Sequence, residues 1–464
     1  MSEYGDQNSS LVTARRLLWL YCILWVAEGA LRKWVLPQFS LQLLLVRDPL
    51  ALLIYYFAAR GRVFPSNGLL TFLWLITGLV SVQGLIHAMM GDVSLIVAAF
   101  GIRTFFLHLP LIWVVPALFG RQEIAALGKW VLYLAPFLAL LMVVQFEVGP
   151  DHWLNAATLK GGAQLGSVDG KIRPPAVFSF ITGPVHFFAL ATVFVMAGVL
   201  TAKLYPSWLV ASGAVSILMA MAVCASRGLV LGCFLVAAAA AVGSFVTGKR
   251  IGAMVAMGIG LMVAVLVLAS FGVMKQGFAA FMERWISQDE VAMGVSGSSV
   301  MTQRVGSSFL SAFDWAGQVP LGGLGVGVTS NLAIEKNASS IPVEGEWERV
   351  IYEVGPITGF LFLGLRTVIA FRMLALGYGA LRTGNFLCLL LGAACCFDVI
   401  SGNIRQVTSY GFIAVCSGMC FAAHKAFSGG DELPIAEQVE EIMLEKPRAR
   451  GRGRFAVGGT PVQS

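Results

Sequence analysis

Long apolar segments recur along this 464-residue chain, and they constrain its fold more than any other feature of the sequence. A run of about 20 apolar residues crosses a bilayer as a helix. Every backbone polar group must be satisfied inside the lipid, so repeated runs of this length predict a helical bundle and not a β-barrel. Since only 12% of the residues are charged and 57% are hydrophobic, we expect an all-α, polytopic integral membrane protein.

By this length rule we expect about twelve transmembrane helices. They lie near residues 17–31, 42–59, 68–88, 95–118, 128–148, 180–202, 207–225, 228–247, 251–275, 351–371, 384–400 and 406–424. The fourth expected span contains Arg103 and His108, and the tenth contains Arg366 or ends near it. The first apolar run lacks a signal peptide's arrangement, so we expect it to be retained.

Lysine and arginine residues in the loops predict the orientation, because cytoplasmic loops are enriched in them. The pattern favours a cytoplasmic N-terminal segment at 1–16, a transmembrane domain at 17–426 and a flexible basic cytoplasmic tail at 427–464. The basic residues are scattered between spans, so the formal charge of +7 does not indicate nucleic-acid binding. Solvated disorder is the simpler interpretation of the tail, and contact with anionic lipid heads is the alternative.

This orientation leaves two long segments outside, at 149–179 and 276–350. Loops of such length are usually functional or disordered. The second loop carries Trp285, Trp315 and Trp347 and a glycine-rich turn, which is poor composition for disorder. We therefore expect the chemistry on the extracytoplasmic face.

Cysteine and histidine usage predicts neither a disulfide framework nor a metal centre. All eight cysteines lie in apolar segments, where small buried side chains are the default interpretation. The five histidines show no metal-ligand spacing, and His186 is expected to be a packed or hydrogen-bonded core residue. We expect no cofactor.

Five arginines stand out on the expected outer side: Arg173, Arg227, Arg304, Arg349 and Arg405. Ionisable groups in or beside spans are costly and often mark function. An arginine at a helix end can also snorkel to the interface or form a structural ion pair. That simpler reading is favoured for Arg405 near Asp398, and for the Arg32–Lys33 pair near Glu28.

Arg227 favours a function because it stands in the abrupt turn "CASRGLVLG" between two apolar helices, with no acidic neighbour in sequence. A guanidinium group suits a diphosphate, since its fork binds phosphate oxygens in bidentate fashion and stays charged.

An acidic cluster opens the tenth span, in "PVEGEWERVIYEVG" at 342–355. If a helix begins near 346, Glu346, Arg349 and Glu353 share one face of it. Acids favour a helix N-terminus, which accounts for one or two of the four glutamates. A carboxylate near arginines at the water–lipid boundary suits a general base acting on a hydroxyl.

Three motifs, in order, resemble the O-antigen ligase and polymerase superfamily of bacterial envelope polysaccharide enzymes. They are "ASRGLVLG" at 225–232, Arg304 followed by "PLGGLGVG" at 320–327, and "EGEWERVIYEVGPITGFLF" at 344–362. The similarity covers roughly residues 16–425. Ligases of this family usually carry a histidine nine residues before the glutamate of their E-x-G motif. Here that position is Glu344, and 276–350 contains no histidine, which favours a polymerase.

The resemblance implies a metal-independent glycosyltransferase in the bacterial inner membrane. A sugar hydroxyl of an acceptor glycan would attack the anomeric carbon of a glycan on undecaprenyl diphosphate. Arg173, Arg227 and Arg304 would hold the diphosphate. Polysaccharide export and chain-length proteins are implied as further partners.

One of Glu344, Glu346 and Glu348 would take the hydroxyl proton, with Arg349 positioning that carboxylate or contacting sugar. The tryptophans of the large loop would stack on sugar rings. Two alternatives stay open. One is a ligase that passes finished glycan to lipid A core or protein. The other is a flippase for lipid-linked oligosaccharide, which the low number of interior charges, with Arg103 as the main exception, disfavours.

Overall fold

The computed structural model describes residues 2–158, 164, 166, 170–201, 203–293, 306, 309–330, 333 and 345–428. Within these residues the chain is helical and forms no strand. The candidate site residues Arg304 and Glu344 lie outside the described residues, and so does the expected tail from 429 onward.

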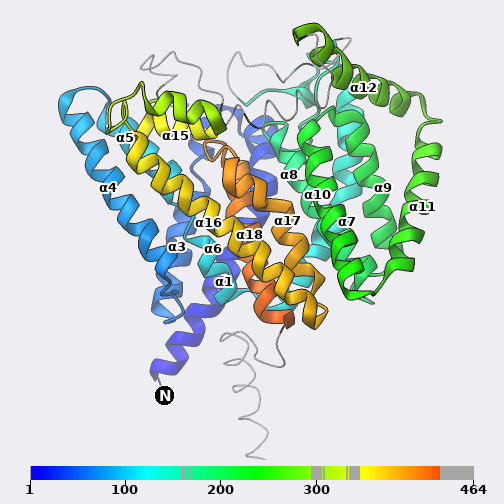
Figure 1. Cartoon of the computed structure of the whole chain (residues 1–464), viewed down its shortest axis with the longest axis horizontal. Helices are drawn as coiled ribbons and strands as arrows, with labels where there is room; N and C mark the ends of the chain where they lie inside the picture. Colours follow the sequence, from blue (N-terminus) through cyan, green and yellow to red (C-terminus); the bar gives the residue numbers. More distant parts are fainter. Residues whose placement is uncertain are drawn as a thin grey trace, which may run out of the picture.

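The structure contains long helices and several short helical turns (Figure 1). The helices are α1 (Ser2–Ala30), α2 (Ser40–Leu43), α3 (Arg47–Arg60), α4 (Gly68–Met90), α5 (Leu95–Phe106), α6 (Leu111–Leu118), α7 (Arg121–Glu147), α8 (Thr182–Leu200), α9 (Ser207–Cys224), α10 (Arg227–Thr247), α11 (Ile251–Leu268), α12 (Gly272–Met293), α15 (Glu346–Val354), α16 (Pro356–Ala380), α17 (Phe386–Ser401) and α18 (Val407–Ser428). The short turns are η1 (Leu31–Val35), η2 (Pro37–Phe39), η3 (Trp153–Asn155) and η4 (Leu381–Thr383).

Helix starts follow local side-chain chemistry. Asn67, Ser94 and Asn385 precede α4, α5 and α17, and each side chain accepts a hydrogen bond from a backbone N–H of the first turn. Such caps satisfy donors that the helix itself leaves unpaired. Pro356 opens α16, where its fixed φ suits the first helical position.

Ten helices of the described chain are long and apolar enough to cross a membrane, so a polytopic helical membrane protein is confirmed. An eleventh is reached if α5 and α6, bent by 46° at their junction, form one broken span. At 16 residues, α17 is shorter than a typical span. Each of the twelve expected segments overlaps a helix, but the count of twelve crossings stays a prediction. Residues 2–16 form the first part of α1.

The bundle has two ends, which we name after the elements found there. The chain begins at one end, called the N-terminal end, and α12 and α15 lie across the opposite end, called the α15 end (Figure 1). Helices α8 and α18 are the most buried spans, whereas α11 is exposed to the surroundings of the bundle along its whole length. The α15 end holds the starts of α8, α10, α16 and α18 and the end of α17.

The bundle interior holds more charge than the sequence led us to expect. Glu28 is buried and bonds Arg32 at 3.2 Å and Arg47 at 3.0 Å, which confirms the expected Glu28–Arg32 pair. Near the α5–α6 break, Asp48 bonds Arg103 at 2.6 Å and contacts His108 at 3.1 Å. The expectation of few interior charges was wrong, because Glu28 pairs with Arg47 and Asp48 with Arg103 between different helices inside the bundle.

Candidate functional site

Helix α15 is a short amphipathic element that lies outside the long spans. It begins after Gly345, carries Glu346 and Glu348 in its first turn, and ends at Gly355. The backbone at Gly355 has φ +78°, a left-handed conformation that glycine adopts without steric cost. Pro356 then starts α16, so the chain turns sharply from one helix into the next.

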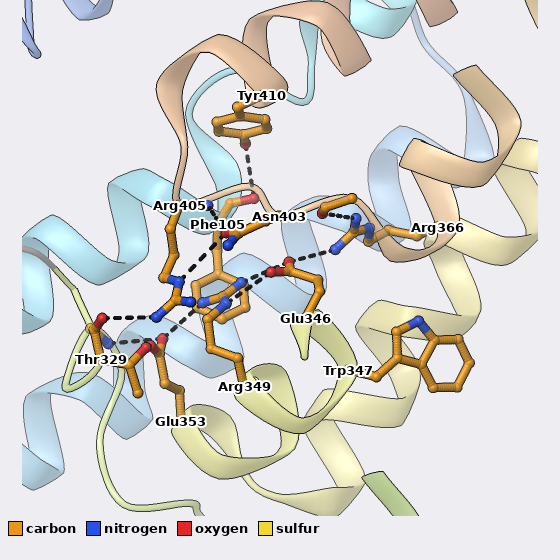
Figure 2. Close-up of polar contacts among 12 residues, drawn as sticks. Phe105, Thr329, Glu346, Trp347, Arg349, Glu353, Arg366, Asn403, Arg405 and Tyr410 are labelled. Atoms are coloured by element: carbon orange, nitrogen blue, oxygen red, sulfur yellow. Dashed lines mark hydrogen bonds and ion pairs between the residues drawn. The ribbon is translucent and has the colours of Figure 1, made fainter. Parts of the chain in front are cut away.

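Arg349 lies at the centre of a buried ion-pair network on α15 (Figure 2). Its Nε and Nη2 donate to the two carboxylate oxygens of Glu346 at 3.0 and 2.9 Å. Its Nη1 donates to Oε2 of Glu353 at 3.1 Å. The guanidinium carbon also lies 4.5 Å from the ring centroid of Phe105, on α5. The predicted face of Glu346, Arg349 and Glu353 is therefore confirmed, and it is turned into the protein.

Arg366, in the first half of α16, extends this network to α17. Its Nη1 donates to Oε1 of Glu346 at 2.7 Å. Its remaining nitrogens donate to the carbonyl oxygens of Val399 at 2.7 Å, Gly402 at 2.8 Å and Asp398 at 3.2 Å. Arg366 thus neutralises Glu346 and binds the backbone carbonyl groups at the C-terminal end of α17.

The glycine-rich turn at 320–327 closes around Glu353. The backbone N–H of Gly327 donates to Oε2 of Glu353 at 3.1 Å, and the Thr329 hydroxyl bonds its other oxygen. Leu324 N–H and Gly325 N–H donate to the carbonyl oxygens of Tyr352 and Glu353 at 2.9 and 3.2 Å. The glycine-rich turn of the large loop therefore packs closely on protein backbone.

Arg405 lies beside the network, just before α18 (Figure 2). Its Nη1 donates to the carbonyl oxygen of Thr329 at 3.1 Å, and its backbone N–H donates to Oδ1 of Asn403 at 3.0 Å. Burial lowers the pKa of Arg405, and the positive charge of Arg349 lowers it further. Three guanidinium groups therefore gather around the two carboxylates of Glu346 and Glu353.

The electrostatics of Glu346 follow from this crowding. Burial alone raises the pKa of a carboxyl group, but the guanidinium groups of Arg349 and Arg366 outweigh burial and hold the pKa of Glu346 below its ordinary value of 4.5. Burial alone would lower the pKa of Arg349, but the carboxylates of Glu346 and Glu353 outweigh burial and raise the pKa above its ordinary value. Glu346 and Arg349 are therefore both ionised at neutral pH.

Glu348, the third described glutamate of the cluster, lies apart from the network. It is half-buried, and one of its oxygens accepts a hydrogen bond from the Ser311 hydroxyl. Trp347, next to it, donates from Nε1 to the carbonyl oxygen of Ile400 at 3.0 Å. Trp315 packs edge-on against Tyr352, so both described tryptophan side chains of the large loop brace α15.

Arg173 and Arg227 belong to a second group at the same end of the bundle. Arg227 is the first residue of α10, after a turn in which Ala225 has φ +47°. Arg173 precedes α8 and acts electrostatically on Cys224, which ends α9. Both arginines are half-buried.

Helix starts converge beside these arginines. Thr182, at the start of α8, donates to Gln406 just before α18 at 2.6 Å. A Cβ built on Gly228, at the start of α10, would lie 3.6 Å from Val185 of α8. The N-terminal ends of α8, α10 and α18 are therefore close neighbours, and each carries partial positive charge.

Sequence reasoning missed two features of this end. Arg366 was noted only as a span boundary, although an arginine in an apolar helix is itself a signal of function or pairing. Asp398 lies 3.4 Å from Nδ1 of His186, a neighbour that the sequence did not indicate. His186 is buried and hydrogen-bonded, as expected, with Ser409 at 2.9 Å.

Among the described residues, no group of three or more His, Cys, Asp and Glu side chains has the arrangement of a metal site. No model of a known protein family matches this sequence, and no curated protein is similar to it.

Proposed function

We propose that this protein is a polysaccharide polymerase of the bacterial inner membrane. It transfers a glycan from undecaprenyl diphosphate to a hydroxyl group of an acceptor repeat unit, at the α15 end of the bundle. The proposal keeps the predicted orientation, in which that end faces away from the cytoplasm. It rests on the motif resemblance together with the chemistry of the described site.

The concentration of positive charge at the α15 end is the observation that carries the proposal. Arg173 and Arg227 lie where the starts of α8, α10 and α18 meet, and Arg405 directly precedes α18. Guanidinium groups and helix N-termini are both favourable partners for phosphate oxygens. The pKa of Arg405 is lowered first by burial and then by the charge of Arg349, and a diphosphate placed there would bring negative charge near this buried cation.

The transfer needs such charge because negative charge develops on the leaving diphosphate. In the proposed step the acceptor hydroxyl loses its proton, its oxygen bonds the anomeric carbon, and the carbon–diphosphate bond breaks with its electron pair going to the diphosphate. Fixed cations at the leaving oxygen stabilise this transition state. We assign that role to Arg173, Arg227 and Arg304.

The described glutamates divide into two roles. Both oxygens of Glu346 are bonded by arginine side chains, and its depressed pKa makes it a weak base. We therefore assign Glu346 and Arg349 to positioning. Glu344 and Glu348 stay candidates for the general base.

The first experiment tests the reaction and the diphosphate assignment together. Purified protein in detergent is given lipid-linked repeat units, and the products are separated by chain length. We expect longer lipid-linked chains with the wild type and a fall of at least about tenfold in turnover with Arg227→Lys, which keeps the charge but loses the fork. Correct folding is checked by thermal stability and by elution as a single species.

Two results would count against this proposal. Full turnover by Arg227→Lys would remove the diphosphate assignment. Accumulation of long lipid-linked chains in cells lacking the protein would indicate a ligase, whereas single repeats would accumulate in the absence of a polymerase.

A flippase is the second candidate, and one observation favours it. Helices α5 and α6 are bent by 46° at their junction, and Asp48, Arg103 and His108 gather there. Broken helices with ionisable groups are typical of transport sites. A flippase moves lipid-linked glycan across a closed vesicle and leaves chain length unchanged, so the detergent assay separates it from a polymerase.

A further inference from the structure

Three helices contribute one side chain each to a connected group at the α15 end. Asp398 of α17 has Oδ2 at 3.4 Å from Nδ1 of His186, on α8. The Nε2 atom of His186 lies 2.9 Å from the hydroxyl oxygen of Ser409, on α18. A carboxylate, an imidazole and a hydroxyl in this order are familiar from acid–base catalysis, where each group orients the next.

Burial tells which end of this group meets a substrate. The side chain of Asp398 is 24% exposed, whereas His186 and Ser409 are buried at 5% and 2%. A nucleophilic role for Ser409 would require an approach to a buried hydroxyl. The accessible end is the carboxylate, so the hydroxyl and the imidazole stand behind it as supports.

The imidazole ring is held in one orientation. It stacks on the Phe412 ring with centroids 4.7 Å apart and an interplanar angle of 11°. When the Ser409 hydroxyl donates to Nε2, the ring proton resides on Nδ1 and faces Asp398. Nδ1 then lies 3.4 Å from one oxygen of Asp398, so the imidazole stands directly beside that carboxylate.

The network on α15 holds the backbone that carries Asp398. Arg366 donates to the carbonyl oxygens of Asp398, Val399 and Gly402, and the same guanidinium bonds Glu346. Trp347 adds a bond to the carbonyl oxygen of Ile400. The ion-pair network on α15 therefore holds the end of α17 in place, a structural role for the acidic residues in addition to helix capping.

Other carboxylates of the described site are committed elsewhere. Both oxygens of Glu346 accept from arginine side chains. Glu353 accepts from Arg349, Gly327 and Thr329. Glu348 accepts from Ser311. Glu346 and Glu353 are buried, and the described support of Glu348 is a hydroxyl group, whereas Asp398 combines partial exposure with an imidazole beside it.

We propose that Asp398 is the general base of the transfer reaction and that His186 is its positioning residue. This inference rests on the proposed function. The acceptor hydroxyl gives its proton to the carboxylate of Asp398 while its oxygen bonds the anomeric carbon and the diphosphate departs with the bonding pair. The proton then leaves Asp398 for water, which restores the carboxylate.

The test uses Asp398→Asn in the purified full-length protein, with lipid-linked repeat units as substrate. We expect kcat to fall by about 100-fold or more, the range that a lost general base gives, with KM within about threefold of the wild type. Asp398→Glu keeps a carboxylate and is expected to recover at least about a tenth of the wild-type kcat. His186→Gln is expected to lower kcat by about tenfold with KM unchanged.

Asp92→Asn is the matched control. Asp92 is also paired with a histidine at the α15 end, His87 at 2.8 Å, but that imidazole bonds the carbonyl oxygen of Gly322. We expect wild-type turnover from this variant. Each variant is first checked for thermal stability and for elution as a single species.

The outcomes separate this inference from the proposed function. If the wild type makes chains and Asp398→Asn keeps kcat within about threefold, the base assignment is wrong and the function stands. A fall of Asp92→Asn equal to that of Asp398→Asn would also overturn the assignment. If the wild type makes no chains from lipid-linked repeat units, the proposed function itself fails.

Discussion

Glu346 shows how much a single residue can depend on distant parts of the chain. The spacing of Glu346, Arg349 and Glu353 in the sequence was enough to predict that they share a helix face. The second cation on Glu346 is Arg366, twenty residues later, and no helical period joins them. That contact exists because the chain turns at Gly355 and Pro356, so it could not be predicted from local pattern.

Replacing Glu346 with glutamine should destabilise the folded protein by about 3–5 kcal/mol. The substitution leaves Arg349 and Arg366 buried with a neutral partner, which is the costly way to break a buried ion pair. Thermal unfolding in detergent measures the change. Asp6→Asn is the control, because Asp6 and Arg60 form an exposed pair at the other end of the bundle and its loss should cause no measurable change.

The penalty for Glu346→Gln should also depend on pH. The folded pKa of Glu346 lies below its ordinary value of 4.5, so its stabilisation is fully present above that pH and is lost as the pH falls through the folded pKa. The difference in stability between wild type and variant should be constant from pH 7 to pH 5 and shrink below. A difference that grew on acidification would contradict the ion-pair account.

At the scale of elements, two motifs far apart in sequence form one unit. The turn at 320–327 and the α15–α16 junction exchange backbone hydrogen bonds, and they share the carboxylate of Glu353. The sequence indicated a tight turn and a helix start separately. Their contact could not be predicted, because glycine spacing reveals where a backbone is approached closely but not by what.

Gly355→Ala tests this unit directly. A Cβ atom there would overlap the carbonyl oxygen of Leu321, in a backbone conformation that already disfavours alanine. We expect a loss of about 2 kcal/mol or more in stability, together with lower transfer activity because α15 would shift. Gly364→Ala is the matched control on α16, where a Cβ meets nothing within 4 Å and alanine should be neutral or stabilising. Equal effects of the two substitutions would contradict the close packing of the 320–327 turn against the α15–α16 junction.

At the scale of the whole molecule, the helical membrane class and the order of the apolar helices were predictable, because the length of an apolar run follows from bilayer thickness, whereas the count of twelve crossings stays a prediction. The break between α5 and α6 was not predictable. It depends on Pro110 and on polar contacts such as Asp48 with His108, which join segments 60 residues apart. The expected end-to-end alternation of the spans also agrees with the placement of the chain's start opposite α12 and α15 (Figure 1).

Which end faces the cytoplasm decides whether lipid-linked glycan can reach the site, and cysteine labelling tests it. Asp151 lies exposed after α7 at the α15 end, and Lys249 lies exposed in the α10–α11 turn at the other end. Asp151→Cys should react with a membrane-impermeant maleimide in intact spheroplasts, and Lys249→Cys should react only after permeabilisation. The eight native cysteines all lie in helices and seven of them are buried, so the unsubstituted protein serves as the background. The reverse labelling pattern would place α15 and its arginines in the cytoplasm and exclude a polymerase acting on the outer face.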